Sequence, residues 1–468
     1  MKAGGPIALP GMGPRANPPR MIVLSFLGII LAGTIVLILP LSTVQPGCMN
    51  PIDALFTAAS ATCVTGLIVV DTGTFFSPFG KAVILILIQI GGLGLMTMST
   101  FFLVLLGKRL SLRERLVLED TMGNVRIRGL KGLLRMVVMT TLLLETAGAA
   151  ILTWRFHLFH GMELKEALVK GVFHSVSGFC NAGFSLFSDN LMAFGEDWWV
   201  TGTVSGLIFL GGIGFLVLFN LINIRFWKRD RTRRGRLRLH SRLALLMSLY
   251  LFLGMFVPLL LGEWDNTLSG MPVSEKFSST VLQALTPRTA GFNTVPVDEL
   301  RPFNLWITLF MMFVGASPGG TGGGIKTVTF VVLAAAVYAL VAQKKEVVIF
   351  RRTIPQKVVL ESLGIAVIGV MVIFIGCAAL LLTEFPNQTV VSSAGHATDL
   401  LFETVSAFGT VGLSVGLTPH LTALGKLIVA SIIFLGRVGP LAVVLMIGRV
   451  AATPGGKIKY PEEMVVVG

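Results

Sequence analysis

The sequence repeats one short pattern four times along the chain. In each copy a glycine follows small or β-branched residues and precedes Leu or Phe, and these glycines are Gly66, Gly183, Gly291 and Gly412. The agreement extends to flanking positions. Ten residues before the glycine stand Phe56, Phe173, Val281 and Phe402; six before it stand Ser60, Ser177, Leu285 and Ser406; two after it stand Ile68, Ser185, Asn293 and Ser414. Self-similarity at such wide spacing indicates a repeated structural unit.

Glycine in these loops predicts backbone that takes positive φ angles or approaches a ligand closely. Four such loops around one axis would place backbone carbonyls at a common centre, and carbonyl rings of this kind replace the hydration shell of a potassium ion. The alternative is that the four loops only turn the chain. We favour the carbonyl ring, because the repeat includes residues upstream of the loops as well as the glycines.

Composition places the chain in a membrane. Of its 468 residues 53% are hydrophobic and only 13% are charged, whereas soluble domains carry about a quarter charged residues. Several apolar runs exceed the ~18 to 20 residues that cross a bilayer. We therefore predict an all-α polytopic membrane protein.

The net charge of +14 is concentrated in alternate loops. Basic residues crowd segments 108–135 and 225–242, whereas the opposite loops hold acids such as Asp71, Asp189 and Glu263. This asymmetry follows the positive-inside rule and argues against nucleic acid as a partner. It predicts that the basic loops, residues 343–357 and both termini lie in the cytoplasm. The basic loops would bind anionic membrane lipids, dock a regulatory partner, or only fix the orientation, and the sequence does not separate these roles.

Each repeat is predicted to consist of a span, a half-helix, the glycine loop and a second span. The predicted half-helices are 53–61, 167–177, 277–285 and 399–407, and the eight spans are 21–42, 79–106, 133–156, 198–226, 243–261, 305–341, 358–382 and 427–447. Odd spans run outward, so every loop lies on the outer side. The divisions are a cytoplasmic N-terminal segment 1–20, repeat 1 at 21–107, a basic linker and repeat 2 at 108–226, a basic linker and repeat 3 at 227–342, a linker and repeat 4 at 343–448, and a C-terminal tail 449–468.

The loop glycines and the two residues before each of them are the predicted ion-coordinating residues. They are Val64, Thr65, Gly66, Asn181, Ala182, Gly183, Thr289, Ala290, Gly291, Thr410, Val411 and Gly412. Half-helices aimed at the loops would present the negative ends of their dipoles to a cation. A glycine cluster in every second span supports the repeat, with Gly91, Gly211, Gly315 and Gly436 at similar distances from the loops. Cys63 and Cys180 share one repeat position and are predicted to be packing residues rather than a disulfide.

With these features the sequence resembles the Trk/Ktr/HKT superfamily of potassium transporters over residues 21–450. The most specific motifs are Thr286–Thr294, Ser317–Thr327 and Phe434–Pro440. The eight-span count is most similar to the pore-forming membrane subunit of Ktr systems. The resemblance implies sodium-stimulated potassium uptake across a bacterial plasma membrane by a homodimer with one pore per subunit. It also implies a cytosolic ring of RCK-type regulatory subunits, separate chains that bind ATP and ADP.

The ion is predicted from the loops. All four keep glycine, whereas some plant relatives have serine in the first loop and carry sodium, so Gly66 points to K⁺. The alternative is a sodium-selective or poorly selective channel of the same fold. No covalently bound cofactor is expected.

A glycine-rich stretch, residues 315–327, interrupts the sixth predicted span. It fails the phosphate-loop pattern, because Ile325 separates Gly324 from Lys326 and apolar runs lie on both sides. Each interior glycine destabilises a helix by ~1 kcal/mol relative to alanine, so an irregular segment is predicted. Our hypothesis is a gate across the pore below the loops, and the alternative is a structural kink. The predicted gate residues are Gly315, Ser317, Pro318, Gly319, Gly320, Thr321, Gly322, Gly323, Gly324, Lys326 and Arg437.

Arg437 is a charge near mid-membrane in the eighth predicted span. Such charges cost at least ~2.5 kcal/mol and face a cavity or a partner. We predict that Arg437 opposes cation flow or anchors the glycine-rich segment through its carbonyls, with a structural ion pair as the alternative. Arg288 is predicted to support the third loop. The other ionisable groups near membrane depth are Glu145, Glu361 and Glu403. Glu403, and His174 at the matching position of the second repeat, would tune the outer vestibule or bond to a neighbouring helix.

The competing reading from another functional class is a membrane-embedded enzyme. It would need carboxylates or histidines that converge at one membrane face, and the sequence offers no such set. We therefore expect no enzymatic activity.

Overall fold

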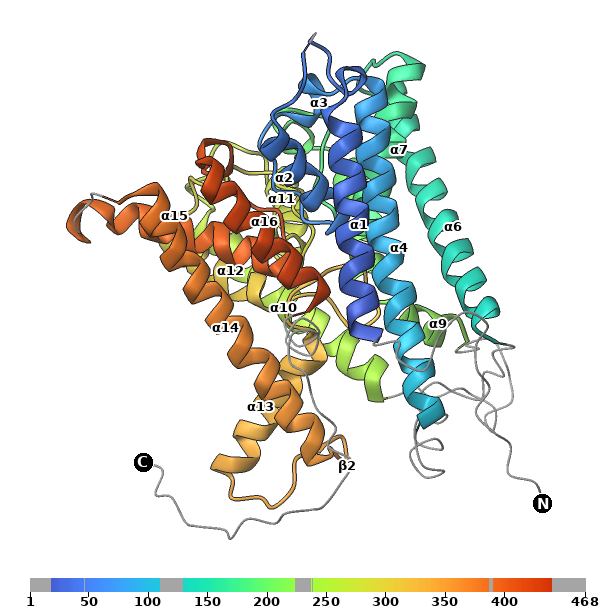
Figure 1. Cartoon of the computed structure of the whole chain (residues 1–468), viewed down its shortest axis with the longest axis vertical. Coiled ribbons are helices and arrows are strands. Elements are labelled where there is room, and N and C mark those ends of the chain that lie inside the picture. The colour runs from blue at the N-terminus through green and yellow to red at the C-terminus, as the bar shows by residue number, and fades with distance from the viewer. Residues whose placement is uncertain are drawn as a thin grey trace.

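The computed structural model describes residues 18–45, 47–109, 129–223, 237, 239–386 and 390–439. The predictions for most of the N-terminal segment, for most of both basic loops, for the end of the eighth span and for the C-terminal tail lie outside these residues. The described chain is mostly helical (Figure 1).

The helices of the described residues are named in chain order. Their bounds are α1 Pro18–Ile38, α2 Pro51–Thr62, α3 Thr72–Phe75, α4 Pro78–Arg109, α6 Gly129–Leu158, α7 Leu164–Cys180, α8 Trp198–Gly212, α9 Phe215–Asn223, α10 Leu239–Gly262, α11 Val273–Leu285, α12 Pro302–Phe313, α13 Thr327–Val341, α14 Gln356–Glu384, α15 Val390–Gly409 and α16 Ala423–Val438. Short 3₁₀ turns lie at Pro40–Ser42, Met192–Phe194 and Thr418–His420.

Local sequence signals explain where several helices begin. Asn50 caps α2 by accepting from the backbone N–H of Ile52, and Pro51 fills the first helical position, where no N–H is needed. Asp197 caps α8 by accepting from the N–H groups of Trp199 and Val200. Thr422 caps α16 in the same way through Gly425 N. These caps fix where the three helices begin.

The four short helices that precede the glycine loops, α2, α7, α11 and α15, are linked into a ring. Helix α4 contacts α7, α8 contacts α11, α12 contacts α15, and α16 contacts α2. An ion pair closes the last of these contacts, with Lys426 Nζ 2.7 Å from Asp53 Oδ1. A hydroxyl pair, Thr201 and Ser278, joins α8 to α11 at 2.7 Å. Helices from the two ends of the chain therefore pack side by side.

The buried core surrounds this ring. The phenylalanines that recur ten residues before the loop glycines, Phe56, Phe173 and Phe402, are all buried in one continuous cluster. The repeated aromatic position is thus a packing position.

Three described helices are long and apolar enough to cross a membrane: Arg135–Leu158, Leu239–Gly262 and Gln356–Glu384. Helices α8 and α9 together also qualify, as a pair bent by 101°. Shorter apolar helices lie at Val23–Ile38, Pro78–Gly94, Pro302–Phe313 and Thr327–Val341. The count of eight spans therefore stays a prediction.

The fourth predicted span, 198–226, is not one continuous helix. It breaks between α8 and α9, where Gly214 takes a φ of 84°. The carbonyls of Gly211 and Gly212 do not continue the helix at this break, because they accept N–H groups of Thr321 and Ser317. The bend results from a contact with a distant segment, which periodicity along the chain does not reveal.

The all-α prediction omitted a short β-hairpin between α13 and α14. Strands β1 (Val348–Ile349) and β2 (Arg352–Thr353) pair antiparallel. Phe350 and Arg351 form the two-residue turn with φ values of 49° and 62°. Tight hairpins need positive φ at both central residues and favour Asn-Gly there. The sequence lacks that signal, which is why the hairpin was missed. Figure 1 places it at the end of the molecule opposite α3.

Candidate ion-conduction site

The four loop glycines meet in a ring. A side chain on Gly291 would lie 2.7 Å from the carbonyl oxygen of Val411 and 2.9 Å from Gly183 Cα. One on Gly183 would lie 2.8 Å from Gly291 Cα, and one on Gly66 would lie 3.0 Å from Gly183 Cα. A side chain on Gly412 would lie 3.1 Å from Gly66 Cα, and this contact closes the ring. The loops therefore follow one another in sequence order around one centre.

All four loops share one backbone conformation. The glycines have φ values between 69° and 94°, and the residues two positions earlier, Val64, Asn181, Thr289 and Thr410, have φ values between 51° and 67°. The residue between them does not have positive φ in any loop. Its carbonyl oxygen lies against the glycine of a neighbouring loop in each case: Thr65 against Gly412, Ala182 against Gly66, Ala290 against Gly183 and Val411 against Gly291. The structure thus gathers all twelve predicted residues, with one carbonyl from each loop at the ring.

Buried hydroxyls hold the loops in this shape. Ser60 Oγ donates to the Leu67 carbonyl at 2.7 Å and accepts from Gly66 N at 3.1 Å. Ser177 Oγ donates to the Phe184 carbonyl at 2.8 Å, and Ser406 Oγ accepts from Gly412 N at 3.1 Å.

The third loop uses the next residue, because leucine stands at the serine position. Thr286 donates through its hydroxyl to the Phe292 carbonyl. The third loop therefore has the same kind of hydroxyl bond as the others, although alignment on the loop glycine shows leucine at the serine position.

An outer cavity of about 290 Å³ opens on one side of the ring. The four loop glycines line it together with Ser185, Asn293 and Ser414. Two carboxylates, Asp71 and Asp189, also line it, and no basic side chain is among its described lining residues. A cleft lined by one sign of charge concentrates ions of the other sign. The cavity therefore favours cations.

Asp71 stays charged in this position. Burial raises the pKa of Asp71, but hydrogen bonds from Ser188 and from the N–H groups of Gly73 and Thr74 together lower it by more. The pKa therefore lies below the usual 3.8. The sequence analysis placed Asp71 and Asp189 only in the acidic loops. Their positions shortly after the first and second glycines were the signal that could have assigned them to the site.

The glycine-rich segment lies against the opposite side of the ring. It has no helix between α12 and α13, as its glycine content predicts. The N–H of Gly323 donates to Thr410 Oγ1 at 3.1 Å. A side chain on Gly322 would collide with Thr289 Oγ1, and Thr321 Oγ1 donates to the Phe179 carbonyl at 3.3 Å. The segment therefore packs directly under residues that begin the loops.

Hydrogen bonds within the glycine-rich segment fix its shape. Its two ends pair through Gly315 N and the Ile325 carbonyl at 2.8 Å. Lys326 Nζ donates to the Gly322 carbonyl at 2.6 Å.

Arg437 is buried and adds a link from α16 to this segment. One guanidinium nitrogen donates to the Thr321 carbonyl, and the other donates to the Gly91 carbonyl at 3.0 Å. No carboxylate pairs with Arg437 among the described residues. Of the roles predicted for Arg437, the contacts fit the carbonyl anchor.

Comparison with known proteins identifies the family. The family named TrkH, described as a cation transport protein, matches residues 21–458. The chain belongs to this family. It is 40% identical to the Ktr system potassium uptake protein B of Bacillus subtilis, with 97% of each chain covered. It is 34% identical to the potassium/sodium uptake protein NtpJ of Enterococcus hirae, over 97% of this chain and 98% of that one.

A solved structure is similar to the whole arrangement. The potassium transporter TrkH from Vibrio parahaemolyticus superposes with a TM-score of 0.71 at 18% identity, covering 93% of this chain and 86% of that chain. This likeness concerns the fold. Membership of the TrkH family makes the chain a membrane transport protein and not an enzyme.

The remaining ionisable groups of this TrkH-family chain lie behind the loops or away from them. Arg288 donates to Ser248 Oγ of α10 at 3.0 Å, and its support of the third loop stays a prediction. Glu361 pairs with Lys357 on an exposed turn of α14. Cys63 and Cys180 are buried and free.

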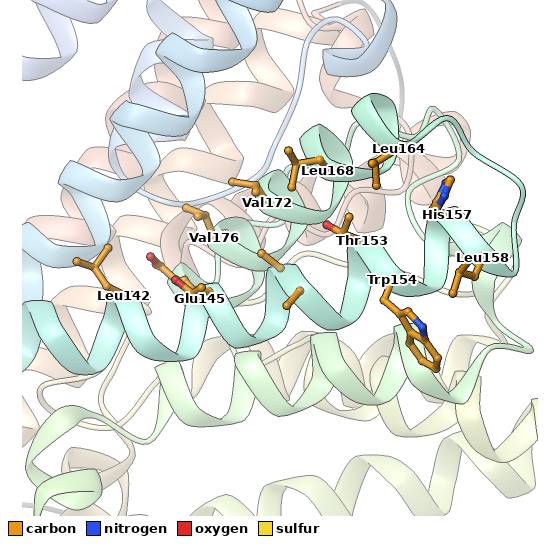
Figure 2. A pocket seen from close by; sticks show the side chains of 13 residues that line it. Leu142, Glu145, Thr153, Trp154, His157, Leu158, Leu164, Leu168, Val172 and Val176 are labelled. Atoms are coloured by element: carbon orange, nitrogen blue, oxygen red, sulfur yellow. The ribbon is translucent and has the colours of Figure 1, made fainter.

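Glu145 lies at one end of a groove of about 610 Å³ between α6 and α7. Figure 2 shows the groove, with Glu145 near Leu142 and Val176 at one end and Trp154 near the other. The Glu145 carboxylate accepts from Gln89 Nε2 at 3.1 Å and lies 3.9 Å from the Cys180 thiol. Glu145 is therefore a brace behind the second loop rather than a group in the ion path.

Proposed function

We propose that this protein is the pore subunit of a potassium uptake system and that K⁺ passes through the ring of four loops. The observation that carries the proposal is the ring itself, to which each loop contributes a glycine and the carbonyl before it. Carbonyl rings replace the hydration shell of K⁺. The relatives from Bacillus subtilis and Vibrio alginolyticus are both named potassium uptake proteins, which supports this choice of ion.

The second candidate function is a sodium-selective or poorly selective channel. One observation favours it, namely the name of the Enterococcus hirae relative, which includes sodium. Glycine in all four loops favours potassium. A serine at position 66 would bring its side chain against the Ala182 carbonyl and Gly183 Cα and would change the ring at the point where ions bind.

We further propose that the glycine-rich segment and Arg437 form the gate. The contacts of the segment with Thr289 and Thr410 support a position that blocks the inner side of the ring. Ion flow requires its displacement. Transport stimulated by Na⁺ and control by a cytosolic RCK-type ring that binds ATP and ADP are parts of this proposal that rest on the family resemblance.

The topology that we propose has eight spans, four half-helices and four repeats with the predicted divisions. Exposed leucine, valine and phenylalanine side chains along α6, α10 and α14 suit contact with lipid. The positive-inside rule, applied to the basic loops of the sequence, supports an orientation with the β-hairpin end in the cytoplasm and the outer cavity outside a bacterial plasma membrane. A homodimer with one ring per chain completes the assembly.

The deciding experiment measures K⁺ and Na⁺ uptake in bacterial cells stripped of their own potassium transporters. Wild-type protein is expected to restore growth at low external K⁺, and Gly66→Ser is expected to lose uptake or shift it toward Na⁺. Coexpression of a regulatory ring tests whether that partner is required. If well-folded protein does not restore uptake even with the ring, the potassium proposal is wrong and only the transport family stands.

A further inference from the structure

Two of the loop-preceding helices carry an ionisable residue at the same position, nine residues before the loop glycine. These residues are His174 in α7 and Glu403 in α15. Each bonds to the serine two residues after its own glycine. His174 Nε2 lies 3.0 Å from Ser185 Oγ, and Ser414 Oγ donates to Glu403 Oε1. The other two repeats hold Thr57 and Leu282 at this position, and Thr57 donates to the backbone carbonyl of Asp53 instead.

The two serines also make the same backbone contact. Ser185 Oγ accepts from Phe187 N at 3.0 Å, and Ser414 Oγ accepts from Gly416 N at 2.9 Å. Each serine thus ties the chain just outside the glycine to the helix just before it. The second and fourth loops are therefore held by the same arrangement of contacts, with a histidine in one and a glutamate in the other.

Glu403 is fully buried and has donors on both carboxylate oxygens. Oε1 accepts from Val415 N at 3.3 Å in addition to Ser414, and Oε2 accepts from Thr418 Oγ1 at 2.6 Å. Every one of these partners lies in the segment that leaves the fourth loop. These donors satisfy both oxygens of a fully buried carboxyl group, so Glu403 holds this segment as a unit.

His174 is also fully buried, and its hydrogen bonds define its tautomer. The Lys170 carbonyl, 2.8 Å from Nδ1, can only accept, so Nδ1 carries the hydrogen and Nε2 accepts. Nε2 accepts from Leu186 N at 3.4 Å and lies 3.0 Å from Ser185 Oγ, whose single hydrogen is shared between Nε2 and the Asn190 carbonyl at 3.3 Å. The same segment reaches the next loop, since Asn190 Nδ2 donates to the carbonyl of Gly291 at 3.3 Å.

The second and fourth loops lie opposite one another, because Gly183 neighbours Gly66 and Gly291 in the ring and Gly412 neighbours the same two. Ser185 and Ser414 both line the outer cavity. The braces therefore fix two opposite walls where ions enter the ring.

We propose that His174 and Glu403 are positioning residues that set the preference for K⁺ over Na⁺ by holding the outer rim of the ring at a fixed width. They act through Ser185 and Ser414 and do not touch the ion. This inference rests on the proposed function. Functional groups must be held within about 0.5 Å of the productive geometry by the residues that support them, and a rim released on one side would adapt to the smaller Na⁺.

The test compares single and double variants of the fourth-loop brace. K⁺ and Na⁺ uptake is measured in the same transporter-deficient cells for Ser414→Ala, Glu403→Gln and the double variant. The matched control is Thr404→Val, which removes a buried hydroxyl of the same helix. Within the described part of the chain this hydroxyl bonds to the Leu400 carbonyl alone, at 2.6 Å. The second brace is tested with Ser185→Ala. Size-exclusion profiles and yield show whether each variant folds.

Each brace variant is expected to lower the ratio of K⁺ to Na⁺ uptake by about fivefold or more, the factor that one lost hydrogen bond supplies. The double variant should lower the ratio by less than the product of the two single effects, because both changes remove the bond between Ser414 and Glu403, and only the bonds from Val415 N and Thr418 to Glu403 and from Gly416 N to Ser414 are separate. A rise in KM for K⁺ without a matching loss of maximal rate is also expected.

A ratio unchanged in the well-folded serine variants would overturn the inference. It would also fail if the two fourth-loop changes add, or if Thr404→Val lowers the ratio equally. Absence of K⁺ uptake by the wild type would instead refute the proposed function, so the two failures are distinct.

Discussion

Arg437→Ala is the change that most directly tests the proposed gate. The guanidinium donates to the carbonyls of Thr321 and Gly91, and it thereby links the glycine-rich segment to α4 and α16. A hydrogen bond from a charged donor contributes about 1.5–3 kcal/mol. Loss of the Thr321 bond alone would shift the balance between the blocking and displaced positions of the segment by about 10- to 150-fold. We expect a faster K⁺ flux.

The assay is K⁺ flux into liposomes that contain the purified subunit without a regulatory partner. Arg437→Lys separates the two roles that the sequence allowed. A lysine keeps the positive charge but lacks the planar fork that reaches two carbonyls. If Arg437 acts by repelling cations, Arg437→Lys should behave like the wild type. If it acts as an anchor, the flux of this variant should lie between those of the wild type and Arg437→Ala.

Removal of residues 319–324 completes the test. The deletion alone should raise flux, and adding Arg437→Ala to it should change little, because the anchored segment is already gone. Unchanged flux in well-folded Arg437→Ala protein would refute the anchor. Lower yield as the only effect would assign Arg437 a purely structural role.

Three further outcomes follow from the described contacts. Gly291→Ala should reduce K⁺ uptake about tenfold or more, because positive φ costs a non-glycine residue about 1–2 kcal/mol and the new methyl group meets Val411 O at 2.7 Å. Uptake near the wild-type rate would show that the ring tolerates a side chain there. Asp53→Asn and Lys426→Met should each lower thermal stability, and a double-mutant cycle should give a coupling of about 1 kcal/mol for the 2.7 Å pair; additive effects would contradict a direct interaction. Burial raises the pKa of Glu263, but hydrogen bonds from Asn304, Asn266 and Arg301 N lower it more, so the pKa lies below its usual 4.5. The stabilisation from Glu263 should therefore be complete above that pH and be lost as the pH falls through the lowered value. The Tm difference between wild type and Glu263→Gln in detergent should shrink over that range, and a constant difference would oppose the assignment.

The sequence predicted the features that depend on local backbone requirements. Positive φ at the loop glycines was expected because only glycine adopts it at little cost, and the structure has it at Gly66, Gly183, Gly291 and Gly412. The break in helix between α12 and α13 was expected for a related reason, since a dense run of glycines cannot sustain a helix.

Tertiary contacts decided three features that the repeat pattern in the sequence does not predict. The bend between α8 and α9 arises where carbonyls of Gly211 and Gly212 bond to the glycine-rich segment, more than a hundred residues later. Thr286 replaces the missing serine of the third loop at the point where α11 ends, six residues before Gly291, whereas α7 and α15 continue to three residues before their glycines. The braces at His174 and Glu403 depend on the return of each loop onto its own helix. Repeats and glycines are local properties that a sequence displays, whereas the partner of a carbonyl or a buried charge exists only once distant segments have packed together.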